Sequence, residues 1–237
     1  MVARIANAAV LCFGNGDPVT FVDAATLGEA WLRTSKTILE HGSDATYDGL
    51  IIKEIAQLTL TVDGPDPDDP VIADLGDPEW SAWMHANFFT PKPVAELGHA
   101  RSYASRLFDY AGTGRDQLAW VAERLRNDSA SRSATITTFE PLLDASYIPC
   151  VSMLDFWVPA GSVELVVYAH SLDFGKKAYG NLVELARLQQ LVAGELGIPV
   201  GRLTVLCKSA HLYEPEFALM AGLVAQAAWL QPAAGTV

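Results

Sequence analysis

The pattern of apolar and polar residues along the chain predicts more strands than helices. Residues 50–62 form a strand-like run in which, from Gln57 onward, polar and apolar residues alternate as they do in a half-buried strand. The apolar run from Ile5 to Phe13 is expected to form a first strand that ends in a turn at 14–18. Further strands are predicted at 134–139, directly after Cys150, after the turn at 159–161, and in a stretch that ends at His211 and Tyr213.

Helical patterns occur in segments that are separated from one another. One helix is predicted from Asp23 or Thr26, either of which can cap it, to about Glu40, with Gly42 ending it. Residues 116–127 are amphipathic, and their inward positions are Leu118, Val121, Ala122 and Leu125. Other helices are predicted from Asp77 to before Pro91, from near Asn181, and from Glu214 to Trp229, while 64–70 is expected to be an acidic loop.

Neither an internal repeat nor a linker between domains interrupts this pattern. Because predicted strands outnumber helices and the helices are dispersed, the pattern favours a single α+β domain over residues 1–237.

Composition narrows the classes of function. Half of the 237 residues are apolar, which is enough for a sizeable core without disulfides or a metal. The formal charge of −12 argues against a general nucleic-acid binder, because binding phosphates needs a basic surface. Three widely spaced cysteines without a Cys-x-x-Cys motif indicate a reducing compartment and no zinc site of the usual spacing. No apolar segment approaches the roughly twenty residues that cross a bilayer, and no signal peptide is evident, so we expect a cytoplasmic protein.

The residues that can carry chemistry lie at the ends of predicted strands within 147–213. Cys150 precedes an apolar strand, and the next strand leads to His170, Ser171 and Asp173. Catalytic groups often lie at the ends of neighbouring elements, so Cys150 is a candidate nucleophile. An inert buried thiol is the alternative, because free cysteines often pack as small apolar residues.

Several other residues keep two interpretations. Glu54 lies either at an exposed edge or buried in a site, and Arg132 is either a solvated charge or an anion clamp. The spacing of Trp80 and Trp83 favours core packing over ligand stacking. Asp155 could be either a site group or an edge residue. Cys12 and Cys207 are expected to be structural, and the residues expected on the surface are His41, His85 and His99.

Four motifs resemble those of the thymidylate synthase family and its pyrimidine hydroxymethylase relatives, and they occur in the family's order. Residues 127–132 (Asn-Asp-Ser-Ala-Ser-Arg) are similar to the family's N-D-P-x-S-R-R, and 148–150 (Ile-Pro-Cys) to its P-P-C nucleophile. Residues 170–173 (His-Ser-Leu-Asp) followed by Asn181 resemble R-S-x-D and the base-reading Asn, and 211–213 (His-Leu-Tyr) match H-[IL]-Y. Each motif alone is weak, but four in order at matching spacing are fairly specific.

Before residue 127 the resemblance is thinner. Glu54 is similar to the family's catalytic glutamate, and Tyr103 with Arg106 and Leu107 resembles its Y-G-x-R-L element.

The resemblance implies a fold, a reaction and an assembly. The fold is one large mixed β-sheet flanked by helices, which dimerises through the sheet. The partners are a pyrimidine nucleoside monophosphate and the one-carbon donor 5,10-methylenetetrahydrofolate. No nucleic acid, membrane or metal is implied.

It also implies roles for single residues. Cys150 adds to C6 of the pyrimidine, Glu54 manages proton transfers, and Tyr103 is a further catalytic residue. Asn181 reads the base edge. The remaining substrate-binding residues are His211 and Tyr213 for the sugar 3′-hydroxyl, Arg132 for the phosphate from the neighbouring subunit, and His170, Ser171 and Asp173.

The departures from the family pattern remove positive charge. His170 stands where the family has Arg, and Ser133 stands where a second Arg is usual. Residues 177–180 and 207–209 also differ from the family's motifs. Lys176, Lys177 and Lys208 are candidates to replace the lost charge. These changes favour a divergent relative that acts on a different pyrimidine nucleotide.

Three functions therefore remain from the sequence. The first is folate-dependent transfer of a one-carbon unit to C5, as methylation or hydroxymethylation. The second is a Cys-His hydrolase that uses Cys150 with His170 or His211. The third is a non-catalytic paralogue that binds nucleotide.

Overall fold

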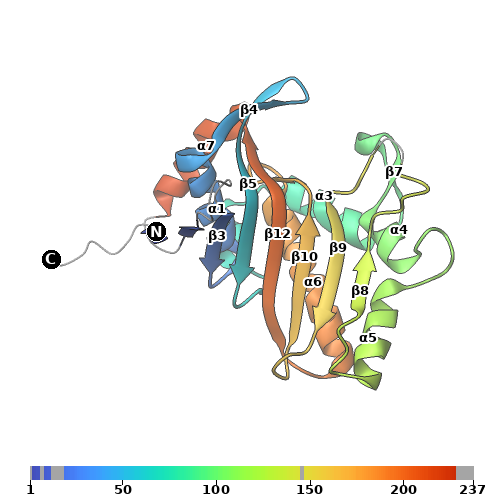
Figure 1. Cartoon of the computed structure of the whole chain (residues 1–237). Coiled ribbons are helices and arrows are strands. Elements are labelled where there is room, and N and C mark those ends of the chain that lie inside the picture. Colours follow the sequence, from blue (N-terminus) through green and yellow to red (C-terminus); the bar gives the residue numbers. More distant parts are fainter. Residues whose placement is uncertain (1, 6–7, 12–18, 145–146, 228–237) are drawn as a thin grey trace.

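A ten-stranded mixed β-sheet forms the frame of the molecule in the computed structural model (Figure 1). The structure describes residues 2–5, 8–11, 19–144 and 147–227. The main path of the sheet runs through β1 (Val2–Ile5), β2 (Ala8–Leu11), β3 (Val19–Ala24), β5 (Leu50–Val62), β12 (Val200–Tyr213), β10 (Val163–Ala169), β9 (Val151–Trp157) and β8 (Ala134–Thr137).

Two long central strands, β5 and β12, run antiparallel and carry the shorter strands beside them. β3 pairs with β5 in parallel, and β10 pairs with β12 in parallel. Near the far ends of the two long strands, β4 (Ser43–Tyr47) pairs with the first residues of β5, and β11 (Leu172–Asp173) with Ala210 and His211 of β12. The sheet therefore extends past β10 at one end, where polar side chains gather.

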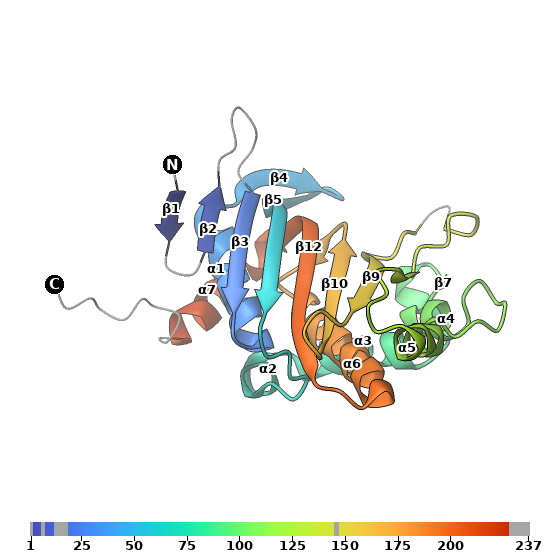
Figure 2. The ribbon, with the colours of Figure 1, turned by 60° about the horizontal axis from the view of Figure 1, so that its bottom comes forward.

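The helices cover one face of this sheet. α1 (Leu27–His41) contacts β5, and α6 (Ala178–Leu196) contacts β10 and β12. α3 (Pro78–Phe89) packs on α6, and a Cβ at Gly180 would lie only 3.0 Å from Cβ of Met84, so glycine permits this close approach. Figure 1 shows these helices behind the strands, and in the turned view of Figure 2 α3 and α6 lie below the sheet. The remaining helices are α2 (Pro70–Leu75), α4 (Tyr103–Phe108), α5 (Gln117–Asn127) and α7 (Phe217–Gln226).

The opposite face of the sheet carries exposed apolar side chains. The strand register places Tyr168 of β10 beside Met153 of β9 on one side and Leu206 of β12 on the other. Their exposed fractions are 37%, 38% and 40%. Paired residues share a face of a sheet, so these three side chains form an apolar row across three strands. Figure 1 looks onto this face, and no described helix passes over it.

Most predicted elements are confirmed. The strand at 50–62 is β5, the helix capped by Thr26 is α1, and 116–127 is α5 with Asp116 as its cap. All four predicted inward positions of α5 are buried. Among the described residues, no helix is long and apolar enough to cross a membrane, and no group of three or more His, Cys, Asp or Glu side chains could hold a metal ion.

Several boundaries were wrong. The run predicted as one strand from Ile5 is divided between β1 and β2, and its last part, with the turn at 14–18, lies outside the described residues. β3, β4 and α2 were not predicted, because they are short or polar. α6 begins at Ala178, close to the start expected near Asn181, and Asn181 lies in the first turn of the helix. A 3-10 turn at Glu214–Glu216 precedes α7, whose end at Gln226 is earlier than predicted; the expected end at Trp229 lies outside the described residues.

A buried arginine ties the chain before Cys150 to α4. The guanidinium of Arg106, only 2% exposed, makes two hydrogen bonds of 2.7 Å to the Asp144 carboxylate. It also donates to the backbone carbonyls of Thr138 (2.8 Å) and Arg101 (3.1 Å). A buried ion pair of this geometry is costly to break, because the remaining charge has no solvent to replace its partner.

We predict that Asp144→Ala lowers the free energy of unfolding by up to about 3–5 kcal/mol, because the buried Arg106 would lose two hydrogen bonds of 2.7 Å and keep only the longer ion pair of 3.9 Å with Glu140. The measurement is equilibrium urea unfolding. Asp63→Ala is the matched control: Asp63 also pairs with an arginine, Arg202, at 2.8 Å, but both side chains are exposed, so we expect a loss of no more than about 1 kcal/mol. Equal effects of the two substitutions would contradict the assignment of Arg106 as a structural anchor.

Candidate active site

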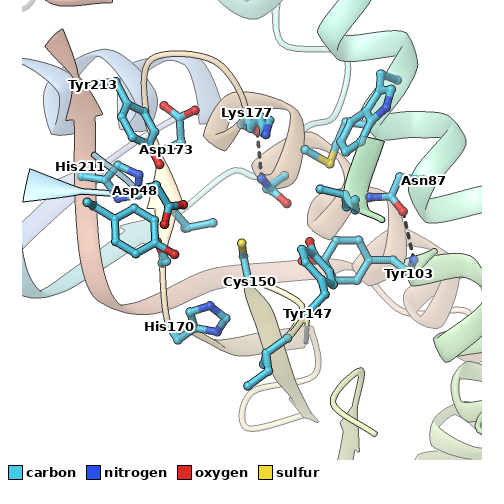
Figure 3. Close-up of a pocket in the computed structure, with 18 residues that line it drawn as sticks. Asp48, Asn87, Tyr103, Tyr147, Cys150, His170, Asp173, Lys177, His211 and Tyr213 are labelled. Carbon is cyan, nitrogen blue, oxygen red and sulfur yellow. Dashed lines mark hydrogen bonds between the residues drawn. The ribbon is translucent and has the colours of Figure 1, made fainter. Parts of the chain in front are cut away.

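A cavity of about 450 Å³ opens where the extended ends of β5 and β12 face the first turn of α6. Eight segments line it, among them the β4–β5 turn, α3, the stretch before β9, and the end of β10. In the view of Figure 3, the Cys150 sulfur points into the open space. Asp48, Asp173, His211 and Tyr213 lie on one side of it, and Asn87, Tyr103 and Tyr147 on the other.

The backbone around Cys150 is fixed on both sides of the residue. The Val151 N–H donates to the Tyr103 hydroxyl at 3.0 Å, and the Cys150 carbonyl accepts from the His170 N–H at 2.9 Å. The Tyr103 ring is stacked on Phe88 with centroids 4.3 Å apart. Burial raises the pKa of the Tyr103 hydroxyl well above its usual value, so the group stays protonated and acts as a fixed dipole. Tyr103 thus positions the start of β9 and also lines the cavity.

Opposing effects act on the pKa of the Cys150 thiol. Burial is the largest of these and raises its pKa, because a thiolate is poorly solvated in the cavity. The nearby Lys177 ammonium lowers the pKa, and the Asp173 carboxylate raises it.

The turn before α6 brings three of the predicted residues to the cavity wall. Asp173 accepts hydrogen bonds from the backbone N–H groups of Gly175 (3.0 Å) and Lys176 (3.3 Å), which tightens the turn. Burial raises the pKa of the Asp173 carboxyl, and its neighbour His211 opposes this. Ser171 lines the same wall.

Asn181 has a defined orientation. Its side-chain N–H donates to the Lys177 carbonyl at 2.9 Å. Because only the amide nitrogen can donate, this bond fixes which end of the side chain is which. Asn181 is buried and lines the cavity, so its carbonyl oxygen is left as an acceptor for a ligand there.

His211 and Glu54 are neighbours across the β5–β12 pair. The Ser209 hydroxyl donates to the Glu54 carboxylate and lies 3.4 Å from Nδ1 of His211. Burial lowers the pKa of His211, while the nearby Asp173 carboxylate raises it. Nε2 of His211 is buried and has no hydrogen-bond partner among the described residues. A neutral imidazole with an unused nitrogen in a cavity is suited to a ligand hydroxyl.

Tyr213 extends the polar wall beyond His211. The two rings meet edge to face with centroids 5.1 Å apart. Burial, followed by the charge of Asp173, raises the pKa of Tyr213 to about 12.

The other half of the cavity is aromatic and apolar. It is lined by Trp83, Met84, Leu97, Tyr147 and Ile148. A wall of this composition suits a flat ring system rather than a phosphate.

The structure brings most, but not all, of the predicted residues together. Cys150, Tyr103, His170, Ser171, Asp173, Asn181, His211 and Tyr213 all line the cavity. Glu54 does not line the cavity; it accepts from the Ser209 hydroxyl, which in turn lies 3.4 Å from Nδ1 of the lining residue His211. Arg132 is exposed in the turn before β8 and is not among the residues that line the cavity.

Sequence reasoning missed Tyr47, Asp48, Asn87 and Tyr147 as lining residues. Only one of these carried a usable signal. Asp48-Gly49 is a typical two-residue hairpin turn, and both residues have positive φ (51° and 77°).

The positions of Asp155, His85 and the two tryptophans decide between the interpretations that the sequence left for them. Asp155 lies on the sheet strand β9 and accepts from the Thr135 hydroxyl at 2.8 Å, away from the cavity. His85 was expected to be on the surface; it is partly exposed and lies 3.1 Å from the buried carboxylate of Glu184. Trp80 and Trp83 pack edge to face at 5.6 Å, and Trp83 also borders the cavity.

Comparison with known proteins agrees with this arrangement. A sequence model described as thymidylate synthase matches residues 68–233. A protein from Methanococcoides burtonii named "Putative thymidylate synthase" is 30% identical over 83% of this chain and 90% of its own length. A protein of the same name from Methanosarcina acetivorans is 29% identical over 86% of this chain and 94% of its own. A bifunctional dihydrofolate reductase-thymidylate synthase from Paramecium tetraurelia is 28% identical over 44% of this chain and 23% of its own length.

The buried imidazole of His211 generates a pH prediction. Its resonance should titrate below the usual histidine range of about 6.5, and Asp173→Asn should lower its pKa further, because the carboxylate that favours the imidazolium is lost. The measurement is an NMR pH titration, with the signal assigned by comparison with His211→Gln. In the unfolded chain the imidazole has its ordinary pKa, so protons bind the unfolded state first, and stability should fall as pH decreases through about 6.5. A rise in the His211 pKa in Asp173→Asn would refute this electrostatic description.

Proposed function

The chain belongs to the thymidylate synthase family, and from this premise we propose that it transfers a one-carbon unit from 5,10-methylenetetrahydrofolate to C5 of a pyrimidine nucleoside monophosphate. The product carries a methyl or a hydroxymethyl group. The observation that carries the proposal is the single cavity that gathers Cys150, Asn181 and His211 from three separate elements. These elements are far apart in sequence, so their convergence supports a shared role in one reaction.

The cavity offers a suitable surface for each of the two reactants. When bound, 5,10-methylenetetrahydrofolate supplies the one-carbon unit as an electrophile. The aromatic and apolar wall around Trp83 and Tyr147 fits a flat pterin ring, because such rings stack on aromatic side chains. The opposite wall, with Asn181 and His211, is polar and fits the nucleotide.

Cys150 performs the covalent step. Its thiolate adds to C6 of the pyrimidine and forms an S–C6 bond, while the electrons of the C5=C6 bond move onto C5 and the O4 carbonyl. This makes C5 nucleophilic. Once C5 carries the one-carbon unit, the C5 hydrogen leaves as a proton, and the bond from the new carbon to the folate nitrogen breaks. The new carbon then takes up a hydride from the reduced folate, which gives a methyl group, or water, which gives a hydroxymethyl group. The S–C6 bond breaks last and releases the thiolate.

Asn181 selects the base through its edge. Its side-chain oxygen is available as an acceptor, because its nitrogen is engaged with the Lys177 carbonyl. That oxygen can accept from N3–H of uracil or from the amino group of cytosine. The remaining N–H hydrogen of the amide can donate to the base as well.

Residues near the neighbouring ends of β5 and β12 bind the sugar and transfer protons. His211, with its unused Nε2, and Tyr213 bind the 3′-hydroxyl. Glu54 manages proton transfers; its contact with the Ser209 hydroxyl, which lies 3.4 Å from Nδ1 of the lining residue His211, supports a link to the cavity.

The phosphate requires a second copy of the chain. Among the described residues that line the cavity there is no arginine, whereas Arg132 is exposed elsewhere. The uncovered apolar row of Met153, Tyr168 and Leu206 supports pairing of two sheets face to face. In such a homodimer, Arg132 of each subunit would reach the phosphate in the other.

The hydrolase alternative has no support in the geometry. In the described part of the chain, the Cys150 sulfur makes no hydrogen bond to an imidazole, although a Cys-His pair requires one. The pKa of His170 is lowered, mainly by burial and to a smaller extent by the positive charge of Lys208.

We predict that the protein releases tritium from C5-tritiated UMP, dUMP, CMP or dCMP when 5,10-methylenetetrahydrofolate is present. Cys150→Ala should abolish release, because no other group can form the C6 adduct. Cys207→Ala is the matched control: this thiol is buried, and burial raises its pKa to about 12, so we expect release to continue. Mass spectrometry of the product separates a methyl from a hydroxymethyl group. Binding of nucleotide without release from any substrate would indicate a non-catalytic paralogue.

A second prediction tests the shared site. Cys150→Ala and Arg132→Ala subunits should each be inactive or weak alone. After the two are mixed in equal amounts and allowed to exchange subunits, half of the dimers contain one subunit of each kind, and each mixed dimer carries one complete site. About one quarter of all sites should therefore be active. Tritium release measures the recovery, and sedimentation equilibrium measures the dimer. Absence of recovery in a proven mixed dimer would show that Arg132 acts within its own subunit.

A further inference from the structure

The missing arginine at position 170 leaves the proposed nucleophile without its expected cation. Three lysines near the site were candidates for the replacement, and their positions in the structure separate them. Lys176 points away and forms an ion pair of 2.6 Å with Glu216. Lys208 is exposed on β12 and does not line the cavity. Lys177 lines the cavity together with Cys150 (Figure 3).

Two tryptophans hold the Lys177 ammonium in place. Its Nζ lies 5.2 Å from the ring centre of Trp80 and 5.8 Å from that of Trp83. An ammonium over an indole face is stabilised by the ring quadrupole, and more strongly the less it is solvated. The backbone of Lys177 is fixed as well, because its N–H donates to the Asp173 carbonyl at 3.1 Å and its carbonyl accepts from Asn181. The charge therefore has a defined place on a residue that lines the same cavity as Cys150.

We propose that Lys177 is the positioning residue that stabilises the Cys150 thiolate, in place of the cation absent at position 170. This inference rests on the proposed function, in which Cys150 reacts as a thiolate. It also gives Trp80 and Trp83 a role beyond packing, as the platform that keeps the ammonium in the cavity.

The other charged and titratable groups around Cys150 cannot take this role. Asp173 raises the pKa of the thiol, and the lowered pKa of His170 keeps that imidazole neutral near pH 7. The remaining groups include Tyr103, Tyr147 and Tyr213, whose raised pKa values keep them neutral, the imidazole of His211, whose pKa is lowered, and the thiol of Cys207. Two further groups on the cavity wall are the phenol of Tyr47 and the carboxylate of Asp48, and neither is a cation. Lys177 is thus the one cation among the described groups that favours the thiolate electrostatically.

The test measures the acidity of Cys150 directly, without nucleotide or folate. The pH dependence of alkylation by iodoacetamide is followed by mass spectrometry of the peptide that carries Cys150. This reagent is uncharged, so the lysine does not attract it. For Lys177→Met we expect the apparent pKa of Cys150 to rise by about one unit, with alkylation at pH 7 slowed about tenfold. Lys177→Arg should stay close to wild type, because it keeps the charge.

Lys176→Met is the matched control, since it removes a neighbouring charge that is paired outside the cavity. It should leave the pKa of Cys150 unchanged. Trp80→Leu provides an independent variant that retains the lysine but removes part of its platform; we expect it to raise the pKa of Cys150 by less than Lys177→Met does. Thermal unfolding confirms that each variant is folded. An unchanged pKa in Lys177→Met, or an equal rise in Lys176→Met, would overturn the proposal.

Failure of this proposal can be told apart from failure of the proposed function. If wild type releases no tritium but Lys177→Met raises the pKa of Cys150, the electrostatic role stands and the transfer reaction is wrong. If wild type releases tritium but Lys177→Met leaves the pKa unchanged, the reaction stands and another group activates the thiol.

Discussion

The antiparallel pairing of β5 with β12 is the constraint on which the site depends. It sets Glu54 opposite His211 and carries both strands past the end of β10. β4 and β11 pair only with these extended ends, so the Asp48 turn and the Asp173 turn owe their positions to the same ladder. Slipping the register by one residue would turn His211 and Tyr213 to the other face, because side chains alternate along a strand. One backbone ladder thus fixes most of the polar wall.

Burial then decides the charge state of that wall. Desolvation raises the pKa values of Cys150 and Asp173 and lowers that of His211, so in each case it favours the neutral form. A cavity of this kind is suited to a neutral base and sugar, but it opposes the thiolate that the reaction needs. In our proposal the Lys177 ammonium, which lies on two indole rings, opposes this effect of burial because its charge favours the thiolate.

The sequence predicted those features that depend on local pattern. β5 and the inward face of α5 were recognisable because alternation and helical spacing are strong over ten or more residues. The start of α6 was predicted only approximately, near Asn181, because its N-cap, Lys177, makes no side-chain capping bond and so carries no signal. β4 is polar and exposed and owes its form to β5. Motif order identified eight residues that do line the cavity, but the burial of Arg106 and the inward direction of Lys177 depend on contacts between distant segments.

In the proposed function, binding of the phosphate depends on dimerisation. Within one chain, the described cavity wall offers a nucleotide the carboxylates of Asp48 and Asp173 and the single ammonium of Lys177. A phosphate carries up to two negative charges and would be repelled from Asp48 unless a further cation were supplied. Arg132 is exposed at the edge of a sheet whose apolar face is uncovered, so covering that face is the step that can bring the arginine to the site. Burial of Met153, Tyr168 and Leu206 would then provide the free energy of association, and the phosphate site would exist only in the assembled protein.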